Sequence, residues 1–280
     1  MRYLEPTTLA EALDVLAEHG EEAKPIAGGQ SLLVLMRERL VEPEWLVGLR
    51  GIAELAALDV DGSARIGATV THAGVLRHPG IARGWPAVAA AEAAVSTVQV
   101  RNRGTLGGST AHAFPNADPP AALVASDAVV HLASRGSEER AVPAAEFFTG
   151  IMETAARPGE LLTAITLPPQ PAGSRSTYLK YVVRPLDWAI VGVAVRVALA
   201  GDGTVSDARV ALNGAADHTL PATDAEQALV GRRPTPDVLA EAARAAARQS
   251  RPLDDVDGSV DYKRRMVAVW TRRALERVLG

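Results

Sequence analysis

The chain of 280 residues is 48% hydrophobic and 22% charged, with a formal net charge of −4. This composition is typical of a globular protein with a sizeable core in one large or two ordinary domains, and the mixed charges give no electrostatic reason to expect nucleic acid as a partner. The absence of cysteine excludes disulfides, thiolate metal sites and an iron–sulfur cluster held by this chain, while the lack of an apolar signal region or a bilayer-length apolar run predicts no membrane insertion and a cytoplasmic location.

The first 55 residues predict a helix followed by a small β-turn-α-β unit. Thr8 and Glu11 have the spacing of a capping box, and the leucine-lined helix that follows ends at Gly20. The remaining elements expected here are a strand over 24–27, an apolar helix over 32–40 and a second strand over 45–49.

The turn Gly28-Gly29-Gln30-Ser31 joins the first of these strands to the helix. Glycines at such a position let backbone N–H groups approach a phosphate, which favours an anion cradle. The same two glycines are also what a simple tight turn requires. The segment matches neither a Walker loop nor a G-x-G-x-x-G fingerprint, so both interpretations stay open.

Residues 56–175 predict a mixed segment of short strands and helices. His72 and His78 are interpreted as surface or capping residues, because no second ligand lies at metal-binding spacing. The elements expected here are strands on both sides of the Asp61-Gly62 turn, a capped helix starting at Thr71, a small-residue helix over 87–95, a strand-like run over 121–132, a loop over 147–150 and a strand over 159–168, with a boundary in the prolines that follow.

The stretch 101–120 is expected to be a long functional loop, since it contains three glycines, three prolines and many small polar residues. Thr105, Gly107, Gly108 and Ser109 offer free N–H groups and two hydroxyls without a formal charge. These groups suit a pyrophosphate or a ribityl chain held by neutral hydrogen bonds.

Four other side chains of this stretch have two interpretations each. Arg101 and Arg103 can supply charge or stack on an aromatic ring, or lie in solvent. His112 can bind a ligand or satisfy backbone groups of the loop. Asp118 can accept hydrogen bonds from ribose hydroxyls, or form a turn before Pro119.

The last segment, 176–280, predicts a three-stranded antiparallel sheet with helices. The expected elements are strands over 176–184, 189–200 and 206–213, helices over 224–230, 237–247 and 262–279, and an irregular loop over 251–260 that is a candidate for facing a partner. Lys24, Lys180 and Lys263 are the only lysines among many arginines. Codon composition explains that bias, but a compact single-point charge is also a role for which arginine is unsuited.

Two segments read together, 24–33 (Lys-Pro-Ile-Ala-Gly-Gly-Gln-Ser-Leu-Leu) and 101–109 (Arg-Asn-Arg-Gly-Thr-Leu-Gly-Gly-Ser), resemble the flavoprotein (medium) subunit of molybdenum hydroxylases. These are enzymes of the aerobic carbon-monoxide dehydrogenase and xanthine dehydrogenase type. Glu160-Leu161-Leu162 and Tyr178-Leu179-Lys180-Tyr181 extend the resemblance, which covers nearly the whole chain.

The resemblance implies an α+β fold with two domains. A bipartite FAD-binding domain of the vanillyl-alcohol oxidase or PCMH type is expected over 1–173, with a small α/β subdomain (1–55) and a larger mixed subdomain (56–173). A carbon-monoxide dehydrogenase flavoprotein C-terminal domain, of three antiparallel strands and helices, is expected over 174–280.

The resemblance also implies non-covalent FAD, with its pyrophosphate between the two glycine motifs. Asp118 then contacts the cofactor further along the loop, Leu161 or Leu162 makes an apolar contact to the flavin region, and Lys180 lies near the isoalloxazine ring. Tyr181 is a candidate for stacking or gating. The residues predicted to bind FAD are Lys24, Pro25, Ile26, Ala27, Gly28, Gly29, Gln30, Ser31, Leu32, Arg101, Gly104, Thr105, Gly107, Gly108, Ser109, His112, Asp118, Leu161, Leu162, Lys180 and Tyr181.

The sequence departs from the family pattern in two places. Ser109 stands where many relatives have asparagine, and Phe114-Pro115-Asn116 replaces the usual acidic start of the loop after the glycines. The second departure bears on contacts to the adenosine side of the cofactor.

The function implied by the resemblance is electron transfer within a heterotrimer. Electrons leave substrate at a molybdopterin-binding large subunit, pass 2Fe-2S clusters in a small subunit, reach FAD here and continue to NAD, a quinone or another acceptor. The missing cysteines agree with this division, and no catalytic residue or metal ligand is assigned to this chain. The alternatives are an FAD-free assembly or ligand-binding subunit and a stand-alone flavin oxidase.

Overall fold

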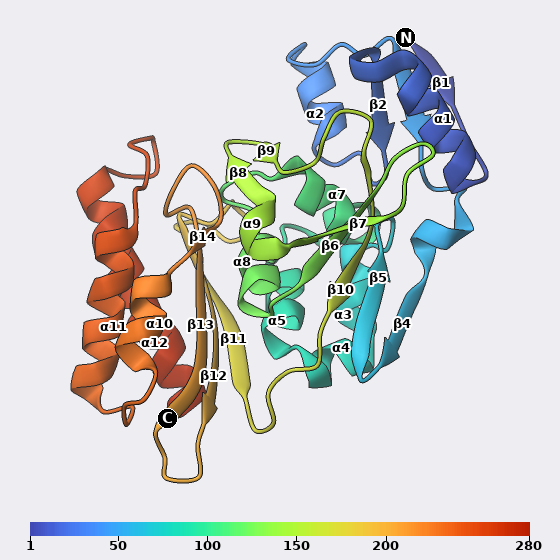
Figure 1. The fold of residues 1–280 in the computed structure, drawn as a ribbon. Coiled ribbons are helices and arrows are strands. Elements are labelled where there is room, and N and C mark those ends of the chain that lie inside the picture. Colours follow the sequence, from blue (N-terminus) through green and yellow to red (C-terminus); the bar gives the residue numbers. More distant parts are fainter.

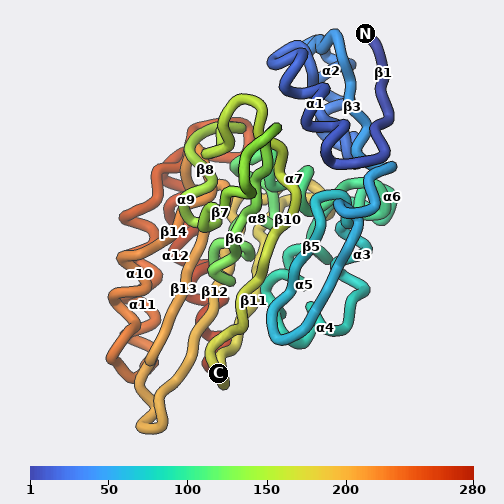
Figure 2. The backbone as a smooth tube through the Cα atoms, turned by 45° about the vertical axis from the view of Figure 1, so that its right-hand side comes forward, coloured from blue at the N-terminus to red at the C-terminus, as the bar shows by residue number.

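The computed structural model describes all 280 residues and contains three larger β-sheets that follow one another along the chain (Figure 1). The N-terminal unit is a small parallel sheet in the order β1-β3-β2, with β1 and β2 both paired to β3. Its elements are β1 (Arg2–Leu4), α1 (Leu9–His19), β2 (Ala23–Ile26), α2 (Leu32–Arg37) and β3 (Trp45–Gly48). Figure 2 shows this unit at one end of the molecule, beyond the larger sheets.

The helix α1 begins as its sequence predicts. The Thr8 side chain accepts from the backbone N–H of Glu11, the Glu11 carboxylate accepts from the backbone N–H of Thr8, and Gly20 ends the helix. The buried face of α1 packs with β3 and the C-terminal part of the unit around Val47 and Ile52.

The middle part is built on a five-stranded antiparallel sheet in the order β4-β5-β10-β6-β7. The late strand β10 lies between β5 and β6, and it pairs with β5 across a separation of about one hundred residues in sequence. The elements are β4 (Leu58–Asp61), β5 (Ser63–Gly67), α3 (His72–Arg77), α4 (Pro79–Gly84), α5 (Pro86–Ala94), α6 (Val98–Arg103), α7 (Leu106–His112), α8 (Asp118–Ala125), β6 (Val129–Ala133), β7 (Arg140–Pro143), α9 (Ala144–Phe147), β8 (Phe148–Gly150), β9 (Glu153–Thr154) and β10 (Leu161–Leu167).

Three predictions for this part are wrong. Residues 147–150, expected to be a loop, form the end of α9 and the strand β8. The stretch 101–120 is largely helical, containing the end of α6, all of α7 and the start of α8. The strand expected over 121–132 is wrong for its first half, because 118–125 form α8, all of whose residues are buried. An apolar run without alternation does not separate a buried helix from a buried strand, and Pro119 and Pro120 fit the first helical turn, where no N–H donor is needed.

The C-terminal part is an antiparallel sheet in the order β11-β12-β13-β14 with three helices. The expected three strands are present, and the short β14 adds a fourth. The elements are β11 (Arg175–Tyr181), β12 (Val191–Leu199), β13 (Val205–Asn213), β14 (Leu220–Pro221), α10 (Thr223–Leu229), α11 (Pro236–Gln249) and α12 (Val260–Leu279).

Both faces of this C-terminal sheet are covered (Figure 1). The helices α10 and α12 pack on one face, and α5 and α8 of the middle part pack on the other. This explains why β12 is buried at eight successive positions from Val191 to Ala198 instead of alternating. No helix is long and apolar enough to span a membrane.

Candidate functional site

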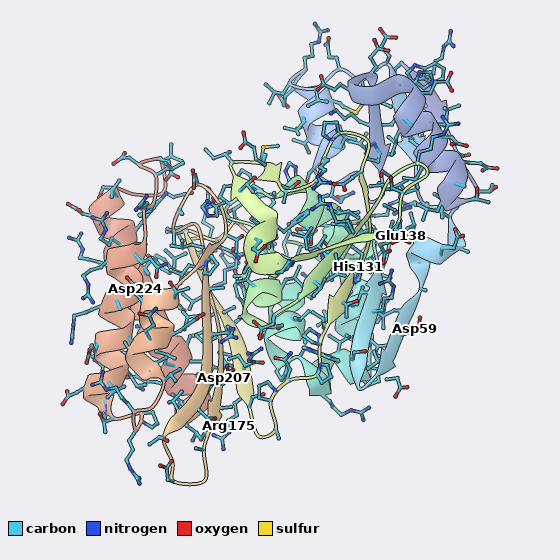
Figure 3. All side chains as sticks on the ribbon, viewed as in Figure 1. Asp59, His131, Glu138, Arg175, Asp207 and Asp224 are labelled. Carbon is cyan, nitrogen blue, oxygen red and sulfur yellow. The ribbon has the colours of Figure 1, made fainter.

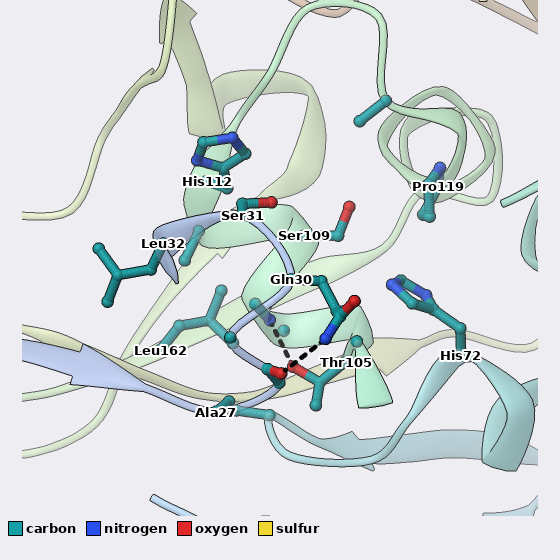
Figure 4. A pocket seen from close by; sticks show the side chains of 18 of the residues that line it. Ala27, Gln30, Ser31, Leu32, His72, Thr105, Ser109, His112, Pro119 and Leu162 are labelled. Carbon is teal, nitrogen blue, oxygen red and sulfur yellow. Dashed lines mark hydrogen bonds between the residues drawn. The ribbon is translucent and has the colours of Figure 1, made fainter. Parts of the chain in front are cut away.

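A cavity of about 670 Å³ is lined by residues of the N-terminal unit, the middle part and the C-terminal sheet. Its size falls within the usual range for cofactor and small-molecule sites. The segments that reach it include the turn after β2, the helix α7, the start of α8, the start of β10 and the end of β11. Figure 4 shows the side chains around it.

The first wall is the turn between β2 and α2. Gly29 adopts φ 73°, a conformation that a side chain would strain, and the Gln30 side-chain amide donates to the carbonyl oxygen of Gly28 at 3.3 Å (Figure 4). A Cβ on Gly28 would lie 2.6 Å from the Cα of Gly104. The two glycine-rich segments therefore touch backbone to backbone, and a larger residue at 28 would separate them.

The second wall is the N-terminal end of α7. The Thr105 hydroxyl accepts from the backbone N–H of Gly108 at 2.9 Å and caps the helix. A Cβ on Gly107 would lie 2.6 Å from both the Cα and the carbonyl oxygen of Ala68. Glycine is thus required at 107 for α7 to pack against the segment that follows β5.

Arg50 joins the two walls, and nothing in the sequence pattern distinguished it from other arginines. Its guanidinium donates to the carbonyl oxygen of Ala27 at 3.2 Å and to that of Arg103 at 3.3 Å. The Arg50 side chain therefore holds the two glycine segments at a fixed distance from each other.

The far side of the cavity holds a cluster of buried polar groups. Lys180 donates to one carboxylate oxygen of Asp118 at 2.8 Å, and the Tyr178 hydroxyl donates to the other at 2.7 Å. Lys180 also donates to the carbonyl oxygen of Ala94 at 3.1 Å. Burial raises the pKa of Asp118 to about 6, although Lys180 and Tyr178 both act in the opposite direction.

An aromatic cluster beside the cavity includes Phe114 of the segment that departs from the family pattern, and its other members, His112 and Trp188, line the cavity. Phe114 lies between His112 and Trp188, with ring centroids 6.2 Å and 4.8 Å away. The Asn116 side chain donates to the carbonyl oxygen of Ala189 at 2.7 Å, which ties this segment to the C-terminal sheet. Burial lowers the pKa of His112, which favours its neutral form beside the cavity.

The structure brings together most of the residues predicted to bind cofactor, and two lie elsewhere. Arg101 does not line the cavity, because its guanidinium donates to the carbonyl oxygens of Val95 and Ser96 at 2.7 Å each. Tyr181 points into the C-terminal domain, where it hydrogen-bonds Tyr262. The predicted residues that do line the cavity are Lys24, Pro25, Ile26, Ala27, Gly28, Gly29, Gln30, Ser31, Leu32, Gly104, Thr105, Gly107, Gly108, Ser109, His112, Asp118, Leu161, Leu162 and Lys180.

The interpretation of His72 as a surface or capping residue is wrong. Its side chain is 5% exposed and lines the cavity, and Thr71 is the residue that caps α3. The His72 Nδ1 atom lies 2.6 Å from a carboxylate oxygen of Glu92, twenty residues away in sequence. Local spacing gave no signal for this pair, because it forms between two helices.

No group of histidine and carboxylate side chains in the structure has the arrangement of a metal site. The cavity instead offers backbone N–H groups at two glycine segments, the two lysines Lys24 and Lys180 and apolar side chains of β10, a set that fits an extended dinucleotide carrying a pyrophosphate. The fold and the cavity therefore define a protein that binds a dinucleotide cofactor.

Comparison with known families agrees with this class. A family model described as the FAD binding domain in molybdopterin dehydrogenase matches residues 1–170, and one described as the CO dehydrogenase flavoprotein C-terminal domain matches residues 176–278. The chain belongs to this family, the FAD-binding medium subunits of molybdenum hydroxylases, which are oxidoreductases.

Individual relatives match over almost their full length. The nicotine 6-hydroxylase medium subunit of Paenarthrobacter nicotinovorans is 34% identical, covering 98% of this chain and 96% of the relative. The carbon monoxide dehydrogenase medium chain of Hydrogenophaga pseudoflava is 35% identical, covering 98% of this chain and 95% of the relative. A solved structure of the carbon monoxide dehydrogenase from H. pseudoflava superimposes with a TM-score of 0.96, at 35% identity and over 99% of this chain and 96% of that one.

Proposed function

We propose that this chain is the electron-transferring FAD subunit of a heterotrimeric molybdenum hydroxylase. The observation that carries the proposal is the cavity itself, in which two glycine segments in backbone contact face Lys180, whose side chain is 11% exposed. When bound, FAD supplies the conversion between one-electron and two-electron chemistry, and this chain supplies its binding, orientation and electrostatics.

The glycine segments are proposed to hold the pyrophosphate. Backbone N–H groups at residues 28–31 and that of Gly107 at the start of α7 give neutral donors on two sides, while Arg50 keeps the two segments together. Leu161 and Leu162 at the start of β10 provide an apolar surface for the flavin, and Asp118 together with Lys180 forms its polar border. We propose the cavity-lining residues predicted from the sequence as the FAD-binding set.

Partner subunits are proposed to supply the rest of the electron path. The chain has no cysteine, so 2Fe-2S clusters would lie in a small subunit and the molybdopterin cofactor in a large one. Electrons would leave FAD here to an external acceptor such as NAD or a quinone. Relatives named as the medium subunit of a hydroxylase and the medium chain of a dehydrogenase support this division.

FAD uptake by the purified full chain tests the proposal most directly. We expect the chain to retain or take up one FAD per molecule, measured from flavin absorbance after gel filtration, and to co-purify with an iron-containing and a molybdenum-containing partner from its native source. A colourless chain that takes up no added FAD would support the FAD-free assembly subunit instead. Substrate oxidation by this chain without partners would support a stand-alone oxidase.

Substitution of Lys180 tests the electrostatic part. In Lys180→Ala the ammonium group beside the cavity is lost, so we expect FAD to bind roughly tenfold more weakly and its midpoint potential to fall, because a positive charge stabilises the reduced anionic flavin. Arg232→Ala is the control, since this exposed arginine pairs with Glu241 away from the cavity. Unchanged flavin content and potential in Lys180→Ala would contradict the assigned role.

A further inference from the structure

The buried His72 is held against the second glycine segment. It is the first residue of α3, and its backbone N–H donates to the carbonyl oxygen of Gly104 at 3.0 Å. Thr71 and Thr105 form a β-bridge next to this bond. The imidazole therefore has a fixed position relative to the cap of α7, although its residue is 4% exposed and lines the cavity.

Glu92 on α5 fixes the orientation of this imidazole. One carboxylate oxygen lies 2.6 Å from His72 Nδ1, and the other is buried without a partner. The Glu92 side chain is 0% exposed, so a lone carboxylate charge there would be costly. The short contact to Glu92 occupies Nδ1 and leaves Nε2 as the free ring nitrogen.

Nε2 can donate a hydrogen bond only when it carries a ring hydrogen. That is so in the imidazolium form, where both ring nitrogens carry hydrogen, and in the Nε2–H tautomer, where a protonated Glu92 donates to Nδ1. In the Nδ1–H tautomer, Nδ1 donates to the Glu92 carboxylate and Nε2 only accepts. A donor at Nε2 therefore requires one of the first two forms.

This Nε2 atom has no partner within the protein and borders the cavity. No side-chain hydrogen bond involves it, whereas Nδ1 is fully used by Glu92. A Cβ on Gly104 would lie 3.2 Å from Nε2 and 3.0 Å from Cδ2, so the missing side chain at 104 keeps this edge of the ring open. Figure 4 shows the His72 ring among the residues that line the cavity, on the same side as Thr105 and Gln30.

We propose that the Glu92–His72 pair is an additional cofactor-binding element, in which His72 Nε2–H donates a hydrogen bond to an acceptor oxygen or nitrogen of FAD. This inference rests on the proposed function, since FAD is the ligand that the pair would bind. His72 is the contacting residue, and Glu92 is a positioning residue that acts only through the imidazole. No motif of the sequence pointed to either residue.

Two amide substitutions of His72 separate this role from a purely structural one. The amide of glutamine occupies roughly the place of Nε2, and that of asparagine the place of Nδ1. We expect His72→Asn to keep the contact to Glu92 but to bind FAD about tenfold more weakly, the effect of one lost hydrogen bond. We expect His72→Gln to bind FAD within about threefold of wild type, and to unfold at a lower temperature because Glu92 loses its partner.

The measurements are FAD titration by flavin fluorescence and thermal unfolding of the full-length chain. His218→Asn is the matched control, because His218 forms a similar 2.6 Å contact with Asp217 outside the cavity. Equal FAD affinity of the two His72 variants, whether equal to wild type or equally weakened, would overturn the proposal. A wild-type chain that binds no FAD would instead reject the proposed function, and this inference with it.

A second measurement tests the donor without cofactor. In the ¹⁵N-labelled chain, the imidazole signals assigned by their loss in His72→Gln should show Nε2 as a protonated, pyrrole-type nitrogen, and adding FAD should shift that signal. A pyridine-type Nε2 in the FAD-free chain would overturn the proposal, because that nitrogen cannot donate.

Discussion

Asp118 lies where three elements meet beside the cavity. Its carboxylate accepts from Lys180 and Tyr178 of β11, and its backbone carbonyl accepts from the Asn213 side chain of β13 at 3.1 Å. The residue is 3% exposed, and the penalty of burying its charge exceeds the stabilisation from these donors. The buried charge of Asp118, at the border of the cavity, therefore destabilises the folded chain.

The raised pKa of Asp118 predicts a stability change with pH. Because the pKa of Asp118 is about 6 in the folded chain against an ordinary value of 3.8, the folded state binds this proton more tightly. The stabilisation is complete below about pH 4 and is lost as the pH rises through about 6, amounting to roughly 3 kcal/mol. Urea unfolding should therefore show wild type gaining stability relative to Asp118→Asn when the pH falls from about 7 to about 4.5.

The exposed Asp59 supplies the control for this prediction, and Figure 3 labels it on β4. The difference between wild type and Asp59→Asn should change far less over the same range. A difference between wild type and Asp118→Asn that stays constant with pH would show that Asp118 titrates normally in the folded chain.

At the scale of single elements, α7 is a helix formed by residues that do not favour a helix. The seven-residue α7 contains two adjacent glycines, which are unfavourable in a helix interior. Its position is set by the Thr105 cap and by the close contact of Gly107 with the backbone at Ala68. Packing, rather than helix propensity, therefore determines where α7 lies.

Substitution of Gly107 tests this conclusion. The new methyl group in Gly107→Ala meets the backbone of Ala68, so α7 must move, and we expect a loss of about 2 kcal/mol in the free energy of unfolding together with loss of FAD binding. In Gly84→Ala the methyl group meets nothing within 4 Å, and the helix α4 should be unaffected or slightly stabilised. Equal stability of the two variants in urea unfolding would contradict the packing argument.

In the whole molecule, the C-terminal sheet is joined to the middle part by a buried arginine. Arg196 of β12 is 2% exposed and donates to Asp127 at 2.7 Å, to Asp207 at 2.8 Å and to Gln170 at 3.0 Å. Asp127 and Gln170 belong to the middle part, whereas Asp207 is on β13 (Figure 3). The same interface forms one wall of the cavity, so docking of the two parts and completion of the site are coupled.

Removing this arginine should loosen the two parts from each other. In Arg196→Met we expect about 2 kcal/mol less stability, below the usual cost of breaking a buried ion pair because Asp127 and Asp207 are partly exposed and regain water. Weaker docking should also lower FAD affinity. Calorimetry would check this as a lower unfolding temperature with a broadened or split transition, while a single transition at the wild-type temperature would show that Arg196 does not join the parts.

The sequence by itself determined the features that depend on neighbouring residues. The Thr8 capping box, the strands of the C-terminal sheet and the two glycine motifs depend on local spacing, and the motifs together were enough to indicate the family and its FAD cofactor. The tertiary structure decided the rest. The helical state of 118–125 and the pairing of His72 with Glu92 depend on segments that only folding brings together, because burial and the identity of a distant partner leave no trace in local periodicity.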